Sequence, residues 1–271
     1  MPAPPPTGPL VTRDTLASEL CRLGVRAGET LLVHSSLSAL GWVNGGPVAV
    51  VRGLLDALGP DGTLVVPTQT GHLSDPALWR NPPVPAAWWD TVRATMPAYD
   101  PGTTPSLGVG VIPEAVRTWP GARRSAHPQT SFAALGPRAA DVTDGHARDC
   151  RLGEHSPLAR LERLGARVLL LGAGYDSCTS FHLAEYRVPA PRVPVGRPAP
   201  GGGWETVTEV AISSARFDEL GHDFERDRPV VRGRVGAADA RLFPVADAVA
   251  YAQRWLPLHR PGDEEFAHPP V

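Results

Sequence analysis

The hydrophobic residues of this chain recur at helical spacing in some segments and form short continuous runs in others. Leu16, Leu20 and Leu23 share one face of a predicted helix, which Thr12 caps and Gly24 ends. An unbroken apolar run predicts a buried strand over residues 30–34, followed by a helix over 47–58 and a second strand over 63–66. A strand, a helix and another strand in this order are typical of α/β folds.

Two stretches rich in proline and other turn formers interrupt the rest of the pattern. Further helices are expected over residues 109–118, 157–164 and 244–256, and further strands over 130–135, 167–171 and 204–212. Residues 68–107 form a connection so long that we interpret it as a lid or a binding loop. Residues 188–203 are interpreted as a surface arm between strands.

Composition indicates a globular protein with an ample core, since the chain has 271 residues of which 42% are hydrophobic, and this length allows one large domain or two small ones. We expect a disordered N-terminus over 1–10, a single domain over 11–260 and a loose tail over 261–271. The domain carries an insertion at about 70–100 and the Pro/Gly arm at about 188–203. The first residues lack the features of a signal peptide, and no apolar run approaches the roughly 18 residues of a membrane span.

Charge and cysteine usage exclude several classes of function. All 26 basic residues are arginine, so Schiff-base chemistry and a P-loop phosphate site, which both need lysine, are excluded. The formal net charge of −2 gives no case for a nucleic-acid partner. Three cysteines, Cys21, Cys150 and Cys178, are too few for a disulfide scaffold and favour a reducing cytoplasm.

The segment 167–185 carries the most informative chemistry. Its strand-like run ends at Gly172 and leads to His182 and Glu185, three residues apart. If Thr179 or Ser180 caps a helix there, the imidazole and the carboxylate lie on one face, just beyond the end of a strand. Open α/β sheets place their working groups at such strand ends. The arrangement suits a proton-accepting histidine, and the alternative is a structural histidine.

Two other segments have the composition of anion sites. Residues 33–46 lead from a strand through small residues to a helix, and free backbone N–H groups there suit a phosphate or pyrophosphate. Around Arg123 and Arg124, hydroxyls and His127 suit a phosphorylated adenosine. The alternatives are an ordinary polar loop in the first segment and a solvated basic turn in the second.

Three further patterns are weak, and one carboxylate is a candidate. Residues 172–177 lack the third glycine of a dinucleotide site, and Cys178 with His182 is more typical of a buried thiol than of a nucleophile pair. The spacing of His146, Cys150 and His155 matches no structural zinc site. Glu209, in the predicted strand over 204–212, is a candidate for orienting the imidazole; the alternative is an outward-facing carboxylate.

Seven short motifs occur together in an order typical of one enzyme family. They are Leu32-Val-His-Ser-Ser-Leu37, Gly62-Thr-Leu-Val-Val-Pro67, Tyr99-Asp-Pro101, Arg124-Ser-Ala-His-Pro128, Ser156-Pro157, Leu169-Leu-Leu-Gly172 and Thr179-Ser-Phe-His-Leu-Ala-Glu185. Over roughly residues 12–256 the chain resembles the aminoglycoside 3-N-acetyltransferases of the antibiotic N-acetyltransferase family. The resemblance implies a mixed-sheet α/β sandwich, unlike the general (GNAT) acetyltransferase fold.

The resemblance also implies a reaction. Such enzymes move the acetyl group of acetyl-CoA to the 3-amino group of 2-deoxystreptamine aminoglycosides and cause antibiotic resistance. We therefore expect direct transfer in a ternary complex, with coenzyme A and the aminoglycoside as partners, no metal, no nucleic acid and no membrane, in a monomer or homodimer. One alternative is a biosynthetic or housekeeping N-acyltransferase that uses another amine; another is a catalytically silent protein that binds CoA or drug.

The family's roles map onto this sequence by motif. The catalytic base corresponds to His182, with Glu209 as its acidic partner and Glu185 as the second carboxylate of the site; Thr179 is our candidate for the oxyanion donor. Asp75 and Asp100 are expected, with Glu185 and Glu209, on the drug side. The residues expected to bind CoA are His34, Ser35, Ser36, Leu37, Ser38, Ala39, Leu40, Arg124, His127, Ser131 and Phe132.

Overall fold

The computed structural model describes residues 8–260. Apart from residues 8–10, the predicted disordered N-terminus and loose tail lie outside the described residues. Residues 8–10 are exposed, and the next residue, Val11, forms a bridge with Val43. No helix between residues 8 and 260 is long and apolar enough to cross a membrane.

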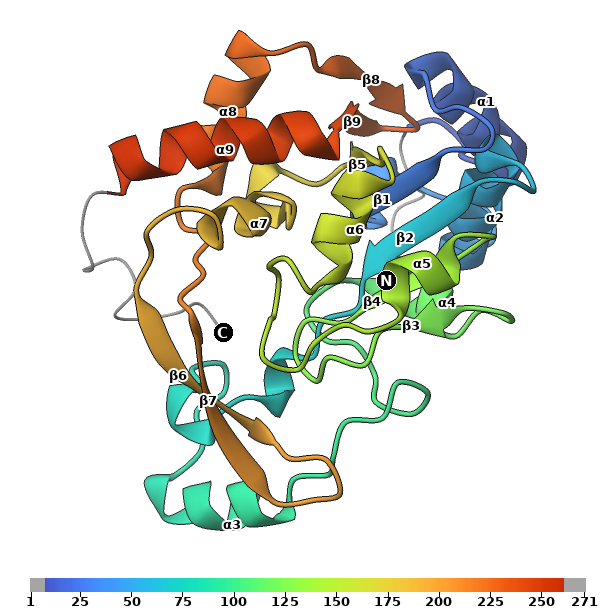
Figure 1. Ribbon diagram of the computed structural model, residues 1–271. Coiled ribbons are helices and arrows are strands. Elements are labelled where there is room, and N and C mark those ends of the chain that lie inside the picture. Colours follow the sequence, from blue (N-terminus) through green and yellow to red (C-terminus); the bar gives the residue numbers. More distant parts are fainter. Residues whose placement is uncertain (1–7, 261–271) are drawn as a thin grey trace, which may run out of the picture.

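A mixed sheet forms the centre of the molecule (Figure 1). Within the described range it has seven strands, in the order β3-β4-β2-β1-β5-β9-β8. β1, β2 and β5 run parallel, and the outer strands pair antiparallel. The bounds are β1 Thr30–Ser35, β2 Thr63–Pro67, β3 Arg123–Arg124, β4 Phe132–Leu135, β5 Arg167–Leu171, β8 Val231–Val235 and β9 Ala238–Pro244. The predicted mixed α/β fold is confirmed.

The central strands are apolar without interruption because both of their faces are buried. In β1, Leu31 and Val33 join one hydrophobic cluster, whereas Leu32 joins the other. In β5, Leu169 belongs to the first cluster and Leu170 to the second. Successive side chains of a strand point to opposite faces, so one short run supplies two separate cores.

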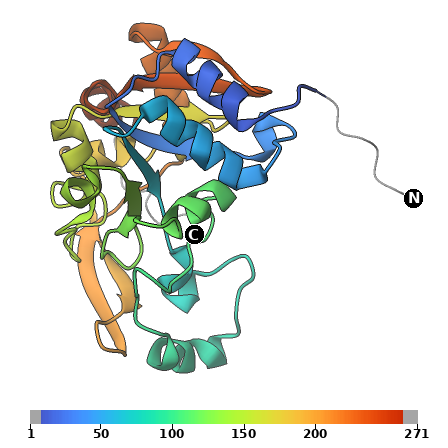
Figure 2. The ribbon, with the colours of Figure 1, turned by 90° about the vertical axis from the view of Figure 1, so that its right-hand side faces the viewer.

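Helices cover both faces of the sheet (Figures 1 and 2). One face carries α1 Arg13–Leu23, α2 Gly46–Leu58 and α4 Val111–Arg117. The other carries α5 Ala139–Thr143, α6 Pro157–Arg163, α7 Phe181–Glu185, α8 Phe217–Asp227 and α9 Val245–His259. The sheet is thus the middle layer of a three-layer structure.

The first helix shows how local sequence sets an element's ends. Thr12 and Thr15 form a reciprocal capping box at the start of α1, and Gly24 ends the helix with φ of 107°. Both ends agree with the sequence-based prediction. The helix packs on α2 so closely that a Cβ at Gly53 would lie 2.9 Å from that of Leu16.

A second lobe projects from one end of the sheet (Figures 1 and 2). It contains the antiparallel hairpin of β6 Arg192–Pro198 and β7 Trp204–Val210, together with α3 Trp89–Thr95 and the 3₁₀ turns Gly71–Leu73, Pro76–Leu78 and Ala86–Trp88. The segment 188–203, interpreted as a surface arm between strands, contains β6, a strand that was not predicted from the sequence. Because β6 pairs with β7 alone, the lost N–H groups of its two prolines, Pro194 and Pro198, are tolerated.

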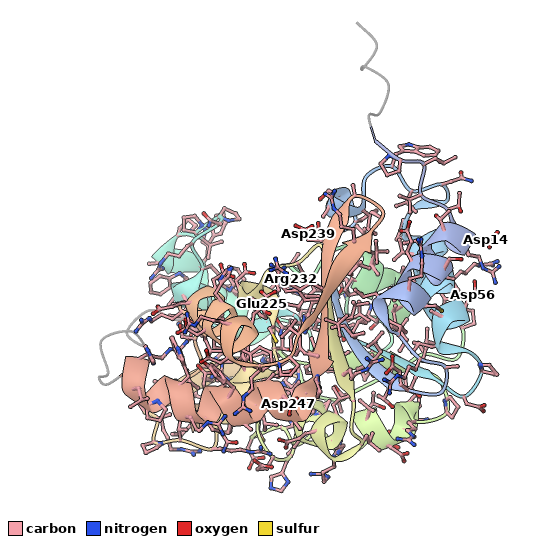
Figure 3. The ribbon with its side chains drawn as sticks, turned by 90° about the horizontal axis from the view of Figure 1, so that it is seen from above. Asp14, Asp56, Glu225, Arg232, Asp239 and Asp247 are labelled. Carbon is pink, nitrogen blue, oxygen red and sulfur yellow. The ribbon has the colours of Figure 1, made fainter. Side chains whose placement is uncertain are left out.

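The sequence pattern did not predict α3, α5, α8, β3, β8 or β9. β8 is an edge strand with two exposed arginines, Arg232 and Arg234, so its hydrophobic signal is weak. Glu225 of α8 connects this edge to the helix layer through ion pairs with Arg232 at 2.8 Å and Arg241 at 3.1 Å. Figure 3 shows Glu225 and Arg232 close to each other.

Candidate active site

A cavity of about 950 Å³ lies at the carboxyl ends of the parallel strands β1, β2 and β5. Its wall is formed by the segments that follow these strands, by residues 108–111, and by the segment leading into α7. This is the edge at which open α/β sheets place their ligands. The cavity has the size of a small-molecule site.

The segment after β1 forms one side of the cavity. His34, Ser35, Ser36, Leu37 and Ser38 line it, as the predicted CoA loop requires. Two other residues expected in that loop, Ala39 and Leu40, do not line it. Leu40 is fully buried in the hydrophobic core, and Ala39 packs against Gly172, where an added Cβ would come within 2.5 Å of its own. We therefore leave these two residues out of the proposed cofactor site.

His182 lies on α7 with Glu185 beneath it. The His182 Nδ1 lies 2.6 Å from Glu185 Oε2, so Nδ1–H donates to the carboxylate. Neither Thr179 nor Ser180 caps α7 through its side chain, contrary to the expected cap; backbone bonds from His182 N to Thr179 O and from Leu183 N to Ser180 O form the turn instead. His182 lines the cavity, and its Nε2 forms no hydrogen bond within residues 8–260.

Glu185 is held on its other side as well. Its Oε1 accepts hydrogen bonds from Arg260 Nη1 at 2.6 Å and from the Ser213 backbone N–H at 3.0 Å. The Glu185 side chain is only 2% exposed, so these donors replace the water it loses. Glu185 is therefore the carboxylate that is hydrogen-bonded to His182.

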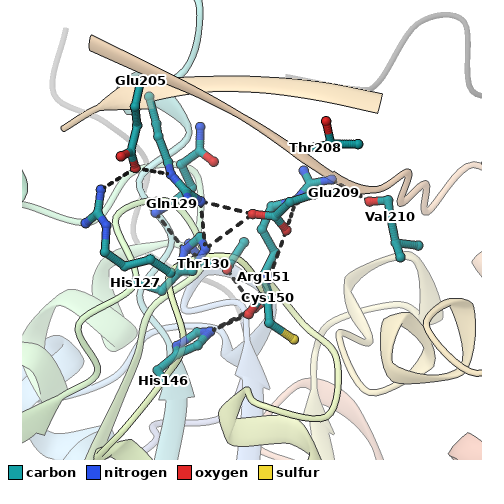
Figure 4. A network of polar contacts seen from close by, with 12 residues as sticks. His127, Gln129, Thr130, His146, Cys150, Arg151, Glu205, Thr208, Glu209 and Val210 are labelled. Atoms are coloured by element: carbon teal, nitrogen blue, oxygen red, sulfur yellow. Dashed lines mark hydrogen bonds and ion pairs between the residues drawn. The ribbon is translucent and has the colours of Figure 1, made fainter. Parts of the chain in front are cut away.

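Glu209 belongs to a different cluster, in the second lobe (Figure 4). Its Oε1 accepts from Arg197 Nη1 at 3.0 Å, and its Oε2 accepts from the Arg151 backbone N–H at 3.0 Å and from Tyr186 at 3.2 Å. Burial alone would raise the pKa of Glu209, but contact with His127 and the charge of Arg151 lower it to about 2. The prediction that Glu209 is the partner of His182 is corrected, because β7 directs this carboxylate to two arginines.

The cofactor-side prediction for the segment 124–132 is corrected too. His127 is fully buried, its Nδ1 accepts the N–H groups of Gln129 and Thr130, and its ring stacks on His146 at 4.8 Å (Figure 4). Burial lowers the pKa of His127, which keeps it neutral. Ser131 and Phe132 are also fully buried. None of these side chains lines the cavity.

Arg124 holds loops together. Its guanidinium donates to Thr68 O at 2.8 Å and Ser131 Oγ at 3.0 Å, and it also bonds the carbonyl oxygens of Pro101 and Thr104. Burial lowers the pKa of Arg124. Because these protein acceptors already engage all three of its guanidinium nitrogens, Arg124 is not placed to grip a phosphate.

Thr179 and His34 meet inside the cavity wall. Thr179 Oγ1 lies 3.3 Å from His34 Nε2, and both residues line the cavity. Burial, with a smaller contribution from the nearby His182, lowers the pKa of His34 to about 3. His34 is therefore a neutral partner for the hydroxyl of Thr179. The role of Thr179 as an oxyanion donor stays a prediction.

None of the four acidic residues predicted on the drug side lines the cavity: Glu185 and Glu209 are described above, and Asp75 and Asp100 lie in the long connection 68–107. Asp75 caps a 3₁₀ turn through Ala77 N and pairs with Arg93 at 2.7 Å. Asp100 accepts from the N–H groups of Thr103 and Gly102 at 2.7 and 2.9 Å, and these bonds lower the pKa of Asp100. Each carboxylate is thus satisfied by its own loop, which corrects their assignment to this site.

Several residues of the cavity wall were not predicted from the sequence, among them Gln69, Asp176, Ser214 and the segment 108–111. Asp176 had a usable signal, because it lies between Gly174 and Cys178 in the segment that carries His182. The segment 108–111 contains no reactive side chain, so its sequence gave no signal of a site. Cys178 is fully buried, and burial raises the pKa of its thiol to about 12, so it is no nucleophile. No group of three or more potential metal ligands occurs in residues 8–260.

Residues 32–257 match the family model described as aminoglycoside 3-N-acetyltransferase. The chain belongs to the aminoglycoside 3-N-acetyltransferase family. The SPbeta prophage-derived aminoglycoside N(3')-acetyltransferase-like protein YokD of Bacillus subtilis is 44% identical over 90% of this chain and 92% of its own. Aminoglycoside N(3)-acetyltransferase VIII of Streptomyces fradiae is 40% identical over 91% and 92%, respectively.

Solved structures agree with the family assignment. The crystal structure of YokD has a TM-score of 0.91 at 42% identity, covering 95% of this chain and 97% of that one. AAC-IIIb in binary complex with CoASH has a TM-score of 0.79 at 32% identity, covering 92% and 97%. This member of the aminoglycoside 3-N-acetyltransferase family is therefore an acetyl-transferring enzyme, and its fold is the predicted non-GNAT type.

Proposed function

We propose that this enzyme transfers the acetyl group of acetyl-CoA to the 3-amino group of a 2-deoxystreptamine aminoglycoside, and thereby confers resistance. One observation carries the mechanism: His182 donates Nδ1–H to Glu185, while its Nε2 makes no hydrogen bond within residues 8–260 and the residue lines the cavity. The names of relatives, such as aminoglycoside N(3)-acetyltransferase VIII, support the choice of acceptor.

His182 acts as a general base. An ammonium group has no lone pair, so the sugar amine gives one proton to solvent before it attacks, and its nitrogen must lose a second proton as it bonds to the thioester carbon. With Nδ1–H bound to Glu185, the neutral imidazole carries its lone pair on Nε2, where it accepts that proton. The negative charge of Glu185 then stabilises the imidazolium. A positioned base of this kind contributes roughly 10²–10⁴-fold to the rate.

The acetyl group moves in one transfer, without an acetylated protein. The amine nitrogen bonds to the carbonyl carbon, and the oxygen takes a negative charge that the Thr179 hydroxyl or backbone N–H stabilises. Collapse of this intermediate breaks the carbon–sulfur bond, and the sulfur leaves as CoA with a proton returned through His182. The buried, protonated thiol of Cys178 supports direct transfer, because it offers no competing nucleophile.

We place acetyl-CoA, the cosubstrate, against the segment from His34 to Ser38. These residues line the cavity on the side where β1 ends, and the N-terminal residue of α2, Gly46, lines it as well. Serine hydroxyls and backbone N–H groups in that wall suit the polar parts of coenzyme A. The binary complex of the related AAC-IIIb with CoASH supports this choice of cosubstrate.

An N-acyltransferase acting on a different amine is the second candidate. One observation favours it: Asp75 and Asp100, the expected drug-side carboxylates, are bound within their own loops, away from the cavity wall. Asp176 is the carboxylate that does line the cavity. A cavity lined by fewer carboxylates has a weaker electrostatic preference for a strongly cationic substrate.

The test is release of the CoA thiol from acetyl-CoA by the purified enzyme, with a panel of aminoglycosides and simple amines. For the aminoglycoside proposal we expect turnover with 2-deoxystreptamine drugs, and a product acetylated at the 3-amino group by mass and NMR analysis. Turnover with other amines alone would support the second candidate and refute the first.

His182→Ala tests the base, with His155→Ala as a matched control. His155 is exposed and lies outside the cavity wall, so its loss should leave turnover unchanged. His182→Ala should lower kcat by at least about a hundredfold while CoA still binds. Near-wild-type turnover of His182→Ala would remove the base assignment.

A further inference from the structure

Arg260 contacts the carboxylate that orients His182, although it is far from it in sequence. It follows α9 directly, and it lies outside the residues 32–257 that the family model matches. Its Nη1 donates to Glu185 Oε1 at 2.6 Å, and its Nη2 donates to the carbonyl oxygen of Ser213 at 2.5 Å. The guanidinium thus joins the end of α9 to α7 and to the loop before α8.

These contacts close a ring around Glu185. The Ser213 N–H donates to the same Oε1 that Arg260 binds, at 3.0 Å, so one oxygen is held from two directions. The other oxygen, Oε2, is left for His182 Nδ1 at 2.6 Å. A carboxylate with one oxygen fixed cannot rotate freely about its terminal bond, so the position of the second oxygen is fixed as well.

The aromatic ring of Phe217 lies close to both Arg260 and His182. The Arg260 guanidinium lies 5.4 Å from the centre of Phe217, and the His182 ring lies 4.7 Å from it. The side chain of Arg260 is only 4% exposed. A buried guanidinium that makes paired hydrogen bonds has little freedom to move, which suits it to fixing a neighbour's geometry.

We infer that Arg260 is a positioning residue of the transfer reaction: it locks Glu185 so that His182 is held in the orientation needed to accept the proton. The inference rests on the proposed function of His182. Arg260 acts through Glu185 and need not touch either substrate. Its predicted signature is a loss of kcat without a matching change in KM.

Arg260→Met tests this inference, because methionine keeps much of the apolar stem and removes the hydrogen bonds. We expect kcat to fall by about 10- to 100-fold, the effect of a small displacement of a catalytic group, with KM for both substrates unchanged. Arg260→Lys keeps the charge and one donor and should recover part of the loss. Arg254→Met is the matched control, since Arg254 is an exposed arginine of α9, the helix that Arg260 follows.

A measurement on the resting protein separates this inference from the proposed function. The short bond from His182 Nδ1–H to Glu185 should give a downfield ring-proton NMR signal, identified by its loss in His182→Ala. Arg260→Met should shift or abolish that signal, whereas Arg254→Met should leave it. If the wild-type enzyme acetylates no amine in the panel, the proposed function fails, and the NMR signal still decides whether Arg260 holds the pair.

Two results would overturn the inference. One is an Arg260→Met enzyme with the kcat and the His182 ring signal of Arg254→Met. The other is a fall in activity that merely follows the unfolded fraction, measured by thermal unfolding at the assay temperature, while the ring signal of the folded fraction is unchanged.

Discussion

Gly172 affects both the stability of the fold and the shape of the cavity. It follows β5 with φ of 67°, lines the cavity, and packs against the segment that follows β1. In Gly172→Ala the new Cβ would lie 2.5 Å from that of Ala39 and 3.1 Å from that of Ala238. The variant therefore has two costs, about 1–2 kcal/mol for a left-handed alanine and about 1–3 kcal/mol for overpacking.

Gly165→Ala separates the two costs. Gly165 has nearly the same φ, 65°, and nothing lies within 4 Å of the position that the new methyl group would take. This variant should lose only the backbone cost, about 1–2 kcal/mol. The extra loss in Gly172→Ala, about 1–3 kcal/mol, measures the contact with Ala39 and Ala238.

Urea unfolding of both variants supplies the free energies, and thermal unfolding checks them at about 2–4 °C per kcal/mol for a chain of this size. Because Ala39 adjoins the segment lining the cavity, Gly172→Ala should also raise the KM for acetyl-CoA, while Gly165→Ala should not. Equal losses of stability in the two variants would refute the reasoning about the close contact. A Gly172→Ala protein as stable as wild type would refute the left-handed conformation as well.

Two further predictions concern carboxylates outside the cavity. Glu209→Gln leaves Arg197 and Arg151 facing a neutral group, so we expect a loss of about 3–5 kcal/mol near pH 7 in urea unfolding. The lowered pKa of Glu209, about 2 against an ordinary 4.5, means that its contribution is complete above pH 4.5 and is lost as the pH falls towards 2. The unfolding free energy of Glu209→Gln should therefore fall less steeply with acid, and equal slopes would contradict this. Asp100→Ala should lower the melting temperature slightly, because the Asp100 carboxylate caps its own turn. The KM for the amine should stay within about twofold of the wild-type value. A KM raised tenfold would show that Asp100 does belong to the substrate site.

The parts of the fold that could be predicted are those with a local signal. The run before His34 is apolar because both faces of β1 are buried, and Thr12 and Gly24 mark the ends of α1 through their own backbone and side-chain chemistry. The edge hairpin of β8 and β9 lacks such a signal. β8 exposes Val231, Arg232 and Arg234, and its pairing with β9 is decided by the rest of the sheet.

The same distinction applies to the site. His182 and Glu185 are three residues apart on one helix, so their contact follows from helical spacing alone. Arg260 and Ser213 reach Glu185 from distant parts of the chain, and no pattern around them indicates it. Arg124 shows the reverse error: an arginine motif that suits a phosphate in the sequence is satisfied by backbone carbonyl oxygens in the fold.

The two glutamates show what decides between a structural and a catalytic carboxylate. Both are buried, both are paired with arginine, and the sequence alone left open which one serves His182. Donors other than His182 occupy both oxygens of Glu209, and the imidazole that lies near it is that of the buried His127. Glu185 is bound by Arg260 through one oxygen and keeps the other for His182, and an orienting carboxylate needs both features. The assignment thus follows from the geometry of donors around each oxygen, since burial and charge are the same for both.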